Sequence, residues 1–181
     1  MLEPFRDGET SWIFTSKNGT KITIRTLTVD DGKALSDFFA TLSPKAVQWG
    51  LPPYMEEIVA RWIGNLDNLI ALVAVRNELI VGYAAITKST HPRRKAIGEL
   101  AMYLRRDAHN EGIGTAMLAR LIDLSKSQLL HRISLHVVAD NKAAIHVYEA
   151  GGFKLEGILK DAYYGGDYKY HDELVMGLIL P

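Results

Sequence analysis

The stretch from Arg105 to Gln128 constrains the fold more than any other part of this sequence. It reads RRDAHNEGIGTAMLARLIDLSKSQ and joins an apolar run to a long amphipathic run through a Gly-Ile-Gly turn. Its apolar residues recur at the spacing of a helix that buries one face. They are Ile113, Met117, Leu118, Leu121, Ile122 and Leu124. The stretch therefore predicts a strand, a glycine turn and a core-facing helix, in that order.

The other apolar runs extend this alternation along the chain. Asn18-Gly19 separates two β-rich runs and favours a hairpin near the N-terminal end. Helical spacing predicts helices over 32–43, 53–65 and 141–150. Strands are expected over 68–75, 78–86, 96–104, 132–138, 153–159 and 172–180. This order predicts an α/β (α+β) fold, a mixed sheet with helices on its faces.

Composition narrows the class of protein. The 181 residues suit a single domain, which we place at 20–181 behind an N-terminal extension at 1–19. Lysine plus arginine equals aspartate plus glutamate at 21 each, which gives no reason to expect a nucleic acid or a membrane surface as partner. The absence of cysteine excludes disulfides and a thiol nucleophile. No apolar run approaches the ~18 residues of a membrane span, so we expect a cytoplasmic protein.

The glycine turn indicates an anion site. Unpaired amides and the helix dipole both direct positive charge at a loop that precedes a helix. Gly112 and Gly114 let the backbone approach a phosphate, and Arg105, Arg106 and His109 can add charge. The alternative is a glycine pair that only eases strand-to-helix packing.

Two familiar nucleotide motifs do not fit this turn. A dinucleotide fingerprint requires glycine where this chain has Met117, and a P-loop requires Gly-Lys-Ser/Thr where it has Gly114-Thr115-Ala116. The segment instead resembles the pantetheine and pyrophosphate loop of the Gcn5-related N-acetyltransferase (GNAT) family. In that family the loop follows an apolar strand end and reads Arg/Gln-x-x-Gly-x-Gly/Ala.

This resemblance implies that acetyl-CoA is the cofactor. Backbone groups of Met102, Tyr103 and Leu104 would bind its pantetheine arm, and the amides from Asn110 to Thr115 would bind its pyrophosphate. That range comprises Asn110, Glu111, Gly112, Ile113, Gly114 and Thr115. His109 stands where the family has arginine or glutamine, and an imidazole is only partly charged near neutrality.

A second motif lies about 30 residues downstream. NKAAIHVYEAGGF resembles the family pattern Asn-x-x-Ala-x-x-x-Tyr-x-x-x-Gly-Phe and places Asn141, Ala144 and Tyr148 on successive turns of one helix face. The resemblance implies that all three contact the cofactor. An aromatic residue in a short amphipathic helix is more often core, but both motifs occur here in the family's order.

The resemblance covers most of the chain. It implies the GNAT fold, a mostly antiparallel sheet of about seven strands with helices on both faces and, in this chain, an N-terminal hairpin extension. The first half resembles protein-lysine acetyltransferases of the Pat type, whereas the tail GILKDAYYGGDYKYHDELVMGL resembles ribosomal-protein and polyamine acetyltransferases. The acceptor amine, a protein or a small molecule, therefore stays open, and a homodimer is possible.

Acetyl transfer to an amine requires a base and an acid. A lysine-like amine is neutral only about one part in 2,500 at pH 7, which costs roughly 4.6 kcal/mol that a base can reduce. Glu99, a lone carboxylate in an apolar strand that we expect to be buried, is the candidate base. Tyr148 is the candidate acid for the leaving thiolate, and direct transfer is favoured because the chain has no cysteine for an acyl-enzyme.

Other features of the sequence do not by themselves indicate one function. The histidines show no paired metal-ligand spacing, so no metal is expected. Tyrosines 163, 164, 168 and 170 can line the acceptor cleft or pack in a hairpin. Two other functions stay open: a non-catalytic module that binds acyl-CoA as a sensor or docking surface, and a generic nucleotide-binding domain.

Overall fold

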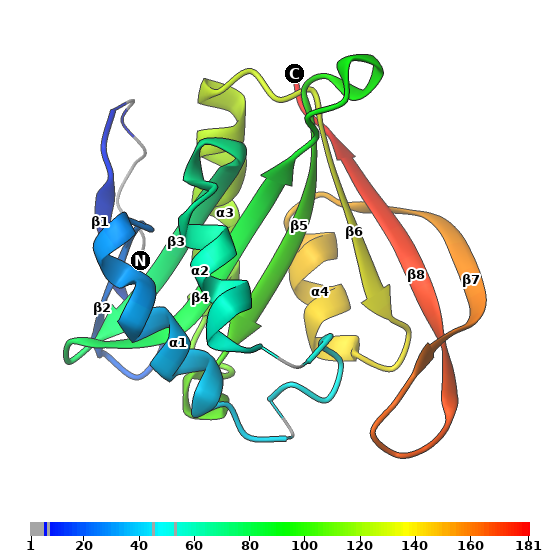
Figure 1. The fold of residues 1–181 in the computed structure, drawn as a ribbon, viewed down its shortest axis with the longest axis horizontal. Coiled ribbons are helices and arrows are strands. Elements are labelled where there is room, and N and C mark those ends of the chain that lie inside the picture. Colours follow the sequence, from blue (N-terminus) through cyan, green and yellow to red (C-terminus); the bar gives the residue numbers. More distant parts are fainter. Residues whose placement is uncertain (1–5, 7, 45, 53) are drawn as a thin grey trace.

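One sheet of eight strands runs through the computed structural model, which describes residues 6, 8–44, 46–52 and 54–181 (Figure 1). The strands lie in the order β1-β2-β3-β4-β5-β6-β8-β7. They are β1 (Ser11–Thr15), β2 (Lys21–Thr26), β3 (Leu69–Arg76), β4 (Leu79–Lys88), β5 (Ile97–Leu104), β6 (Arg132–Val138), β7 (Lys154–Tyr164) and β8 (Tyr170–Ile179). Residues 1–5 and 7 of the expected N-terminal extension lie outside the described residues.

Four α-helices cover the two faces of the described sheet. They are α1 (Gly32–Ala40), α2 (Glu56–Ile63), α3 (Ile113–Ser127) and α4 (Lys142–Ala150). The described chain also forms short 3-10 helices, which are η1 (Val29–Asp31), η2 (Leu66–Asn68), η3 (Pro92–Arg94) and η4 (Arg106–Ala108). Helices α1 and α2 pack on a core around Phe39, Val73 and Tyr83. Helices α3 and α4 pack on the larger core of the other face, around Met117 and Leu121.

The junction of β5 and β6 decides where a site can form. Every neighbouring pair of strands is antiparallel except this one, which is parallel. The two strands pair only from Ile97 with Arg132 to Glu99 with Ser134. Beyond those residues they separate, and α4 is visible between them (Figure 1). The backbone of β5 past Glu99 is therefore left without a strand on its β6 side.

The N-terminal hairpin is continuous with the sheet. Residues 16–20 connect β1 to β2: the Gly19 amide donates a hydrogen bond to the Ser16 carbonyl oxygen at 3.0 Å, and Gly19 has a φ of +84°, a value that glycine adopts without a steric penalty. Strand β1 pairs with β2 from Ser11 opposite Arg25 to Thr15 opposite Lys21. The predicted hairpin is thus present, and its outer strand raises the sheet from about seven strands to eight.

The expected fold class and order of elements are confirmed, with one local error. Strand β5 was expected to be buried on both faces, but the Glu99 and Ala101 side chains are exposed. Both lie on the face of α1 and α2, whose core reaches Tyr83 and Ala85 on β4 but ends before this part of β5.

No helix within the described ranges is long and apolar enough to cross a membrane.

Candidate active site

A cleft of about 470 Å³ opens where β5 and β6 separate. Its walls come from β5, the loop before α3 with the first turn of that helix, the C-terminal half of β6, and α4. The loop between α1 and α2, the β1–β2 turn, β7 and β8 complete them. Residues that line it include Lys17, Trp49, Gly50, Glu99, Met102, Tyr103, Leu104, His109, Asn110, Gly112, Ile113, Gly114, Thr115, His136, Asn141, Ala144, Tyr148, Tyr163 and Glu173. The cleft therefore joins the start of α3 to the exposed carboxylate of Glu99.

The start of α3 forms one end of the cleft. Gly112 is its N-cap with a φ of +85°, and Asn110 also has a positive φ of 61°. A Cβ on Gly112 would meet Phe14 Cζ at 3.3 Å, so only glycine fits here without strain. The amides of Ile113, Gly114 and Thr115 open the helix, and first-turn amides have no acceptor within their own helix. This geometry suits an anion.

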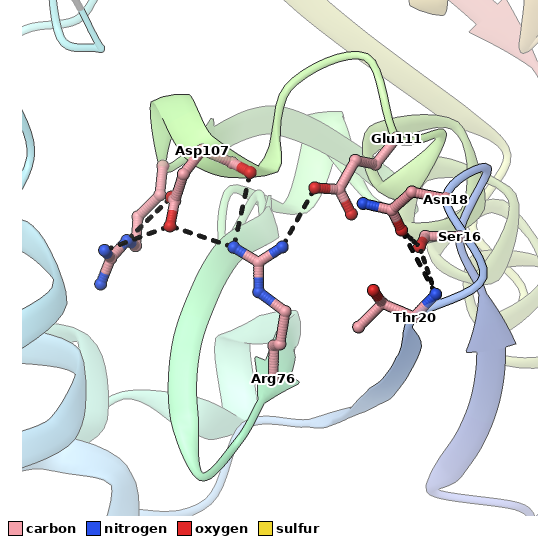
Figure 2. A network of polar contacts seen from close by, with 7 residues as sticks. Ser16, Asn18, Thr20, Arg76, Asp107 and Glu111 are labelled. Carbon is pink, nitrogen blue, oxygen red and sulfur yellow. Dashed lines mark hydrogen bonds and ion pairs between the residues drawn. The ribbon is translucent and has the colours of Figure 1, made fainter.

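A network of ion pairs fixes the loop that precedes α3 (Figure 2). Arg76, at the end of β3, places Nη1 3.0 Å from Glu111 Oε1 and Nη2 3.0 Å from Asp107 Oδ2. Arg105 Nε lies 3.1 Å from the other carboxylate oxygen of Asp107. Both ends of the loop are therefore tied to β3.

This network determines where the charged side chains of the loop lie. Glu111 was expected to offer its backbone amide to the cofactor, which stays a prediction, while its side chain pairs with Arg76 and does not line the cleft. Arg105 and Arg106 were expected to add charge, but neither lines the cleft, and Arg105 pairs with Asp107. Every other predicted site residue does line it.

Helix α4 brings its predicted residues into the wall of the cleft. Asn141 is the N-cap, and its Oδ1 accepts a hydrogen bond from the Ala144 amide at 3.3 Å. Tyr148 is only 6% exposed and packs against Phe153. Burial, with the nearby Tyr103, raises the pKa of Tyr148 above its usual value near 10. Its hydroxyl is therefore protonated throughout the neutral range, as a proton donor must be.

The other end of the cleft carries two carboxylates and aromatic rings. Glu99 and Glu173 both line it, and His136 Nδ1 lies 3.7 Å from Glu173 Oε2. Tyr163 Oη lies 2.7 Å from the Gly50 carbonyl oxygen and thereby holds the loop that carries Trp49. A positively charged or amine-bearing molecule suits this end better than an anion does.

His171 contacts the aromatic residues at this end of the cleft and two aspartates beside them. Its Nδ1 lies 2.7 Å from Asp140 Oδ2 and its Nε2 lies 3.0 Å from Asp167 Oδ1. Its ring also packs 5.0 Å from that of Trp49. The hydrogen bonds to Asp167 and Asp140 raise the pKa of His171. In the described part of the chain no cluster of side chains is suited to hold a metal ion.

The comparison with known protein families decides the class of this site. Residues 35–153, more than half of the chain, match the model of the acetyltransferase (GNAT) family. The chain belongs to the GNAT family. Acetyl-CoA is the co-substrate of that family. The glycine loop, β5, β6 and α4 all lie inside the matched range, whereas Lys17, Tyr163 and Glu173 lie outside it.

Several GNAT proteins resemble this one. The L-amino acid N-acetyltransferase of Escherichia coli strain K12 is 29% identical over 113 residues, which span 56% of this chain and 70% of the relative. The spermidine N(1)-acetyltransferase of Vibrio cholerae is 26% identical over 122 residues, 64% of this chain and 69% of the relative. The solved structure of a ribosomal-protein-alanine N-acetyltransferase from Brucella melitensis has a TM-score of 0.73 at 28% identity, covering 87% of this chain and 99% of that one.

The cleft of this GNAT protein also contains residues that sequence reasoning missed. Lys17 comes from the β1–β2 turn, and Glu173 comes from β8. His136, for which the sequence indicated no role, also lines the cleft. Tyr163 lines the cleft, which was one of the two interpretations of the tyrosine cluster. Tyr164, Tyr168 and Tyr170 are exposed on the β7–β8 hairpin.

Proposed function

We propose that this protein transfers an acetyl group from acetyl-CoA to a primary amine, by direct attack in a ternary complex. The observation that carries the proposal is that three kinds of group line one cleft: the residues whose amides open α3, the tyrosine Tyr148 and the carboxylate Glu99. An anion-binding end, an acid and a base are what an acyl-CoA and an amine require when they meet. The names of the relatives, which act on amino acids, spermidine or ribosomal-protein alanine, support an amine acceptor.

The residues present fit acetyl-CoA. Gly112 has a φ of +85° and no Cβ, so the loop can pack against Phe14 while the amides that follow it open α3, as an anion-binding loop requires. The unpaired side of β5 supplies backbone groups of Met102 and Leu104 for the pantetheine arm. When bound, acetyl-CoA supplies the thioester carbon that the amine attacks.

The proposed roles of the side chains follow from their places. As the bond from the amine nitrogen to the acyl carbon forms and the carbon–sulfur bond breaks, Glu99 accepts the proton that the amine loses, directly or through water. Tyr148 donates its proton to the leaving sulfur, and the thiol is released. His109, Asn141 and Ala144 border the cofactor. Glu99 and Glu173 together attract the protonated form of the amine into the cleft.

The experiment follows thiol release from acetyl-CoA with a panel of acceptors. The panel contains amino acids, spermidine, a lysine peptide and a peptide with an N-terminal alanine, and mass spectrometry identifies the products. We expect equal amounts of free CoA and of one acetylated amine, and no acetyl adduct on the protein when the amine is left out. Tight binding of acetyl-CoA without transfer to any amine, including those of a cell extract, would favour the non-catalytic module instead.

A further inference from the structure

The turn of the N-terminal hairpin lies against the phosphate end of the cleft. The Lys17 amide donates a hydrogen bond to the Glu111 carbonyl oxygen at 3.1 Å. The Lys17 side chain lines the cleft, and its Cε lies 3.9 Å from where a Cβ on Gly112 would stand. Since the ammonium nitrogen lies one bond beyond Cε, it can reach an anion held on the amides that open α3.

Lys17 is the one fixed positive charge among the described residues that line the cleft. Of the described residues that line the cleft, it alone is a lysine or arginine. Two arginines at this end of the fold are already engaged, because Arg76 pairs with Glu111 and Asp107 and Arg105 pairs with Asp107. Lys17 forms no ion pair with any described residue.

The hairpin is held firmly enough to present this side chain. Trp12 of β1 is 2% exposed and lies beneath the Arg120 guanidinium of α3, whose Cζ is 5.1 Å from the ring centroid. Within the turn, Ser16 and Asn18 accept hydrogen bonds from the Thr20 amide (Figure 2). The position of Lys17 is therefore set by the buried Trp12 of β1 and by hydrogen bonds within the turn.

We infer that Lys17 binds the pyrophosphate of acetyl-CoA, so that the hairpin completes the phosphate end of the cleft. This inference rests on the proposed use of acetyl-CoA. It also explains how the site works with His109 and without an arginine among the described residues that line the cleft: the fixed positive charge comes from a residue almost a hundred positions earlier in the chain. An ammonium ion is a strong partner for phosphate oxygens, and it acts as a point charge that tolerates small changes in geometry.

Calorimetry tests this with CoA, dephospho-CoA and pantetheine as ligands. Lys17→Ala keeps the backbone bond to Glu111 and removes the ammonium group with its aliphatic stem. We expect it to weaken binding of CoA and dephospho-CoA about tenfold each, the size typical of one charge-assisted hydrogen bond. Pantetheine, which has no pyrophosphate, should bind equally to both proteins. Lys17→Arg should retain most of the affinity, and the loss in Lys17→Ala should shrink as salt is added.

Lys21→Ala is the matched control, since Lys21 is exposed on the same hairpin but does not line the cleft. Equal CoA affinity in Lys17→Ala, Lys21→Ala and the wild type would overturn the inference alone. A loss that disappears with dephospho-CoA would overturn it too, by moving the contact to the 3′-phosphate. A wild-type protein that binds no CoA would instead overturn the proposed function, and this inference with it.

Discussion

Arg76 Nη1 and Glu111 Oε1 lie 3.0 Å apart and tie the end of β3 to the loop that precedes α3. Both side chains are largely buried, at 17% and 12% exposed. Glu111 Oε2 is buried and has no hydrogen-bond donor among the described residues, so the carboxylate depends on Arg76. Arg76→Leu should cost about 2 kcal/mol of unfolding free energy, because it leaves that charge buried and unpaired.

Thermal unfolding checks this prediction. A loss of that size lowers the Tm of a chain of this length by about 4–8 °C. Arg61→Leu, an exposed arginine on α2, is the control and should leave Tm within about 1 °C. If the two variants unfold at the same temperature, the ion pair does not stabilise the loop.

Tyr148→Phe tests the proposed acid. Removing one hydroxyl from a buried ring should lower kcat about 100-fold and leave the Kd for acetyl-CoA within about twofold. Because the pKa of Tyr148 lies above its usual value, the residue stays protonated and the ratio of the two kcat values should be constant from about pH 7 to 9.5. Unchanged turnover in the variant would remove Tyr148 from the chemistry.

Glu99→Gln tests the proposed base. At pH 7 we expect kcat to fall about 100-fold, since the amide cannot accept the amine proton. The deficit should shrink as the pH approaches about 10, where a far larger fraction of a lysine-like amine is already neutral in solution. Glu78→Gln, on the β3–β4 turn, is the matched control. A larger loss in Glu173→Gln than in Glu99→Gln would transfer the role to Glu173.

His171 should make stability depend on pH. Its pKa is raised above 6.5 by hydrogen bonds to Asp167 and Asp140, and the pKa of Asp167 is lowered below 3.8 by the same contact. The stabilisation that comes from the raised pKa of the histidine is complete below pH 6.5 and is lost as the pH rises through the pKa of His171 in the folded protein. The stabilisation that comes from the lowered pKa of the aspartate is present above pH 3.8 and is lost as the pH falls through the pKa of Asp167 in the folded protein.

His171→Gln should therefore lower Tm most between pH 3.8 and 6.5, and progressively less at higher pH. His131→Gln, an exposed histidine, provides the baseline at each pH. A difference in Tm that stays constant from pH 5 to about 9 would show that packing against Trp49, rather than charge, is what His171 contributes.

The sequence was a good guide to elements whose pattern is local. The apolar spacing after Gly112 predicted α3, and Asn18-Gly19 predicted the hairpin turn. The motif from Asn141 to Tyr148 lies on one helix, so its residues reach the cleft together. Each of these predictions depends on residues only a few positions apart.

Properties that depend on contacts between residues far apart in the sequence could not be predicted in the same way. Glu99 stands among apolar residues, but its exposure depends on where α1 and α2 end over the sheet. The engagement of Arg105 and Glu111 depends on Asp107 and on Arg76 of β3. Lys17 reaches the cleft only because the hairpin packs on α3, and nothing in its own neighbourhood of the sequence indicates this.

His109→Arg tests whether the loop's own histidine takes part in binding. Its Nε2 lies 3.3 Å from the Leu104 carbonyl oxygen, so the imidazole spans the strand end and the loop at the mouth of the phosphate site. An arginine is charged at every pH of interest, whereas an imidazole is not. The variant should bind acetyl-CoA about three- to tenfold more tightly at pH 8, and its affinity should vary less between pH 6 and about 8.5. Combining it with Lys17→Ala should recover part of the lost affinity, because both cations would face the same anion. Affinity and pH dependence equal to those of the wild type would mean that His109 holds the strand end without touching the cofactor.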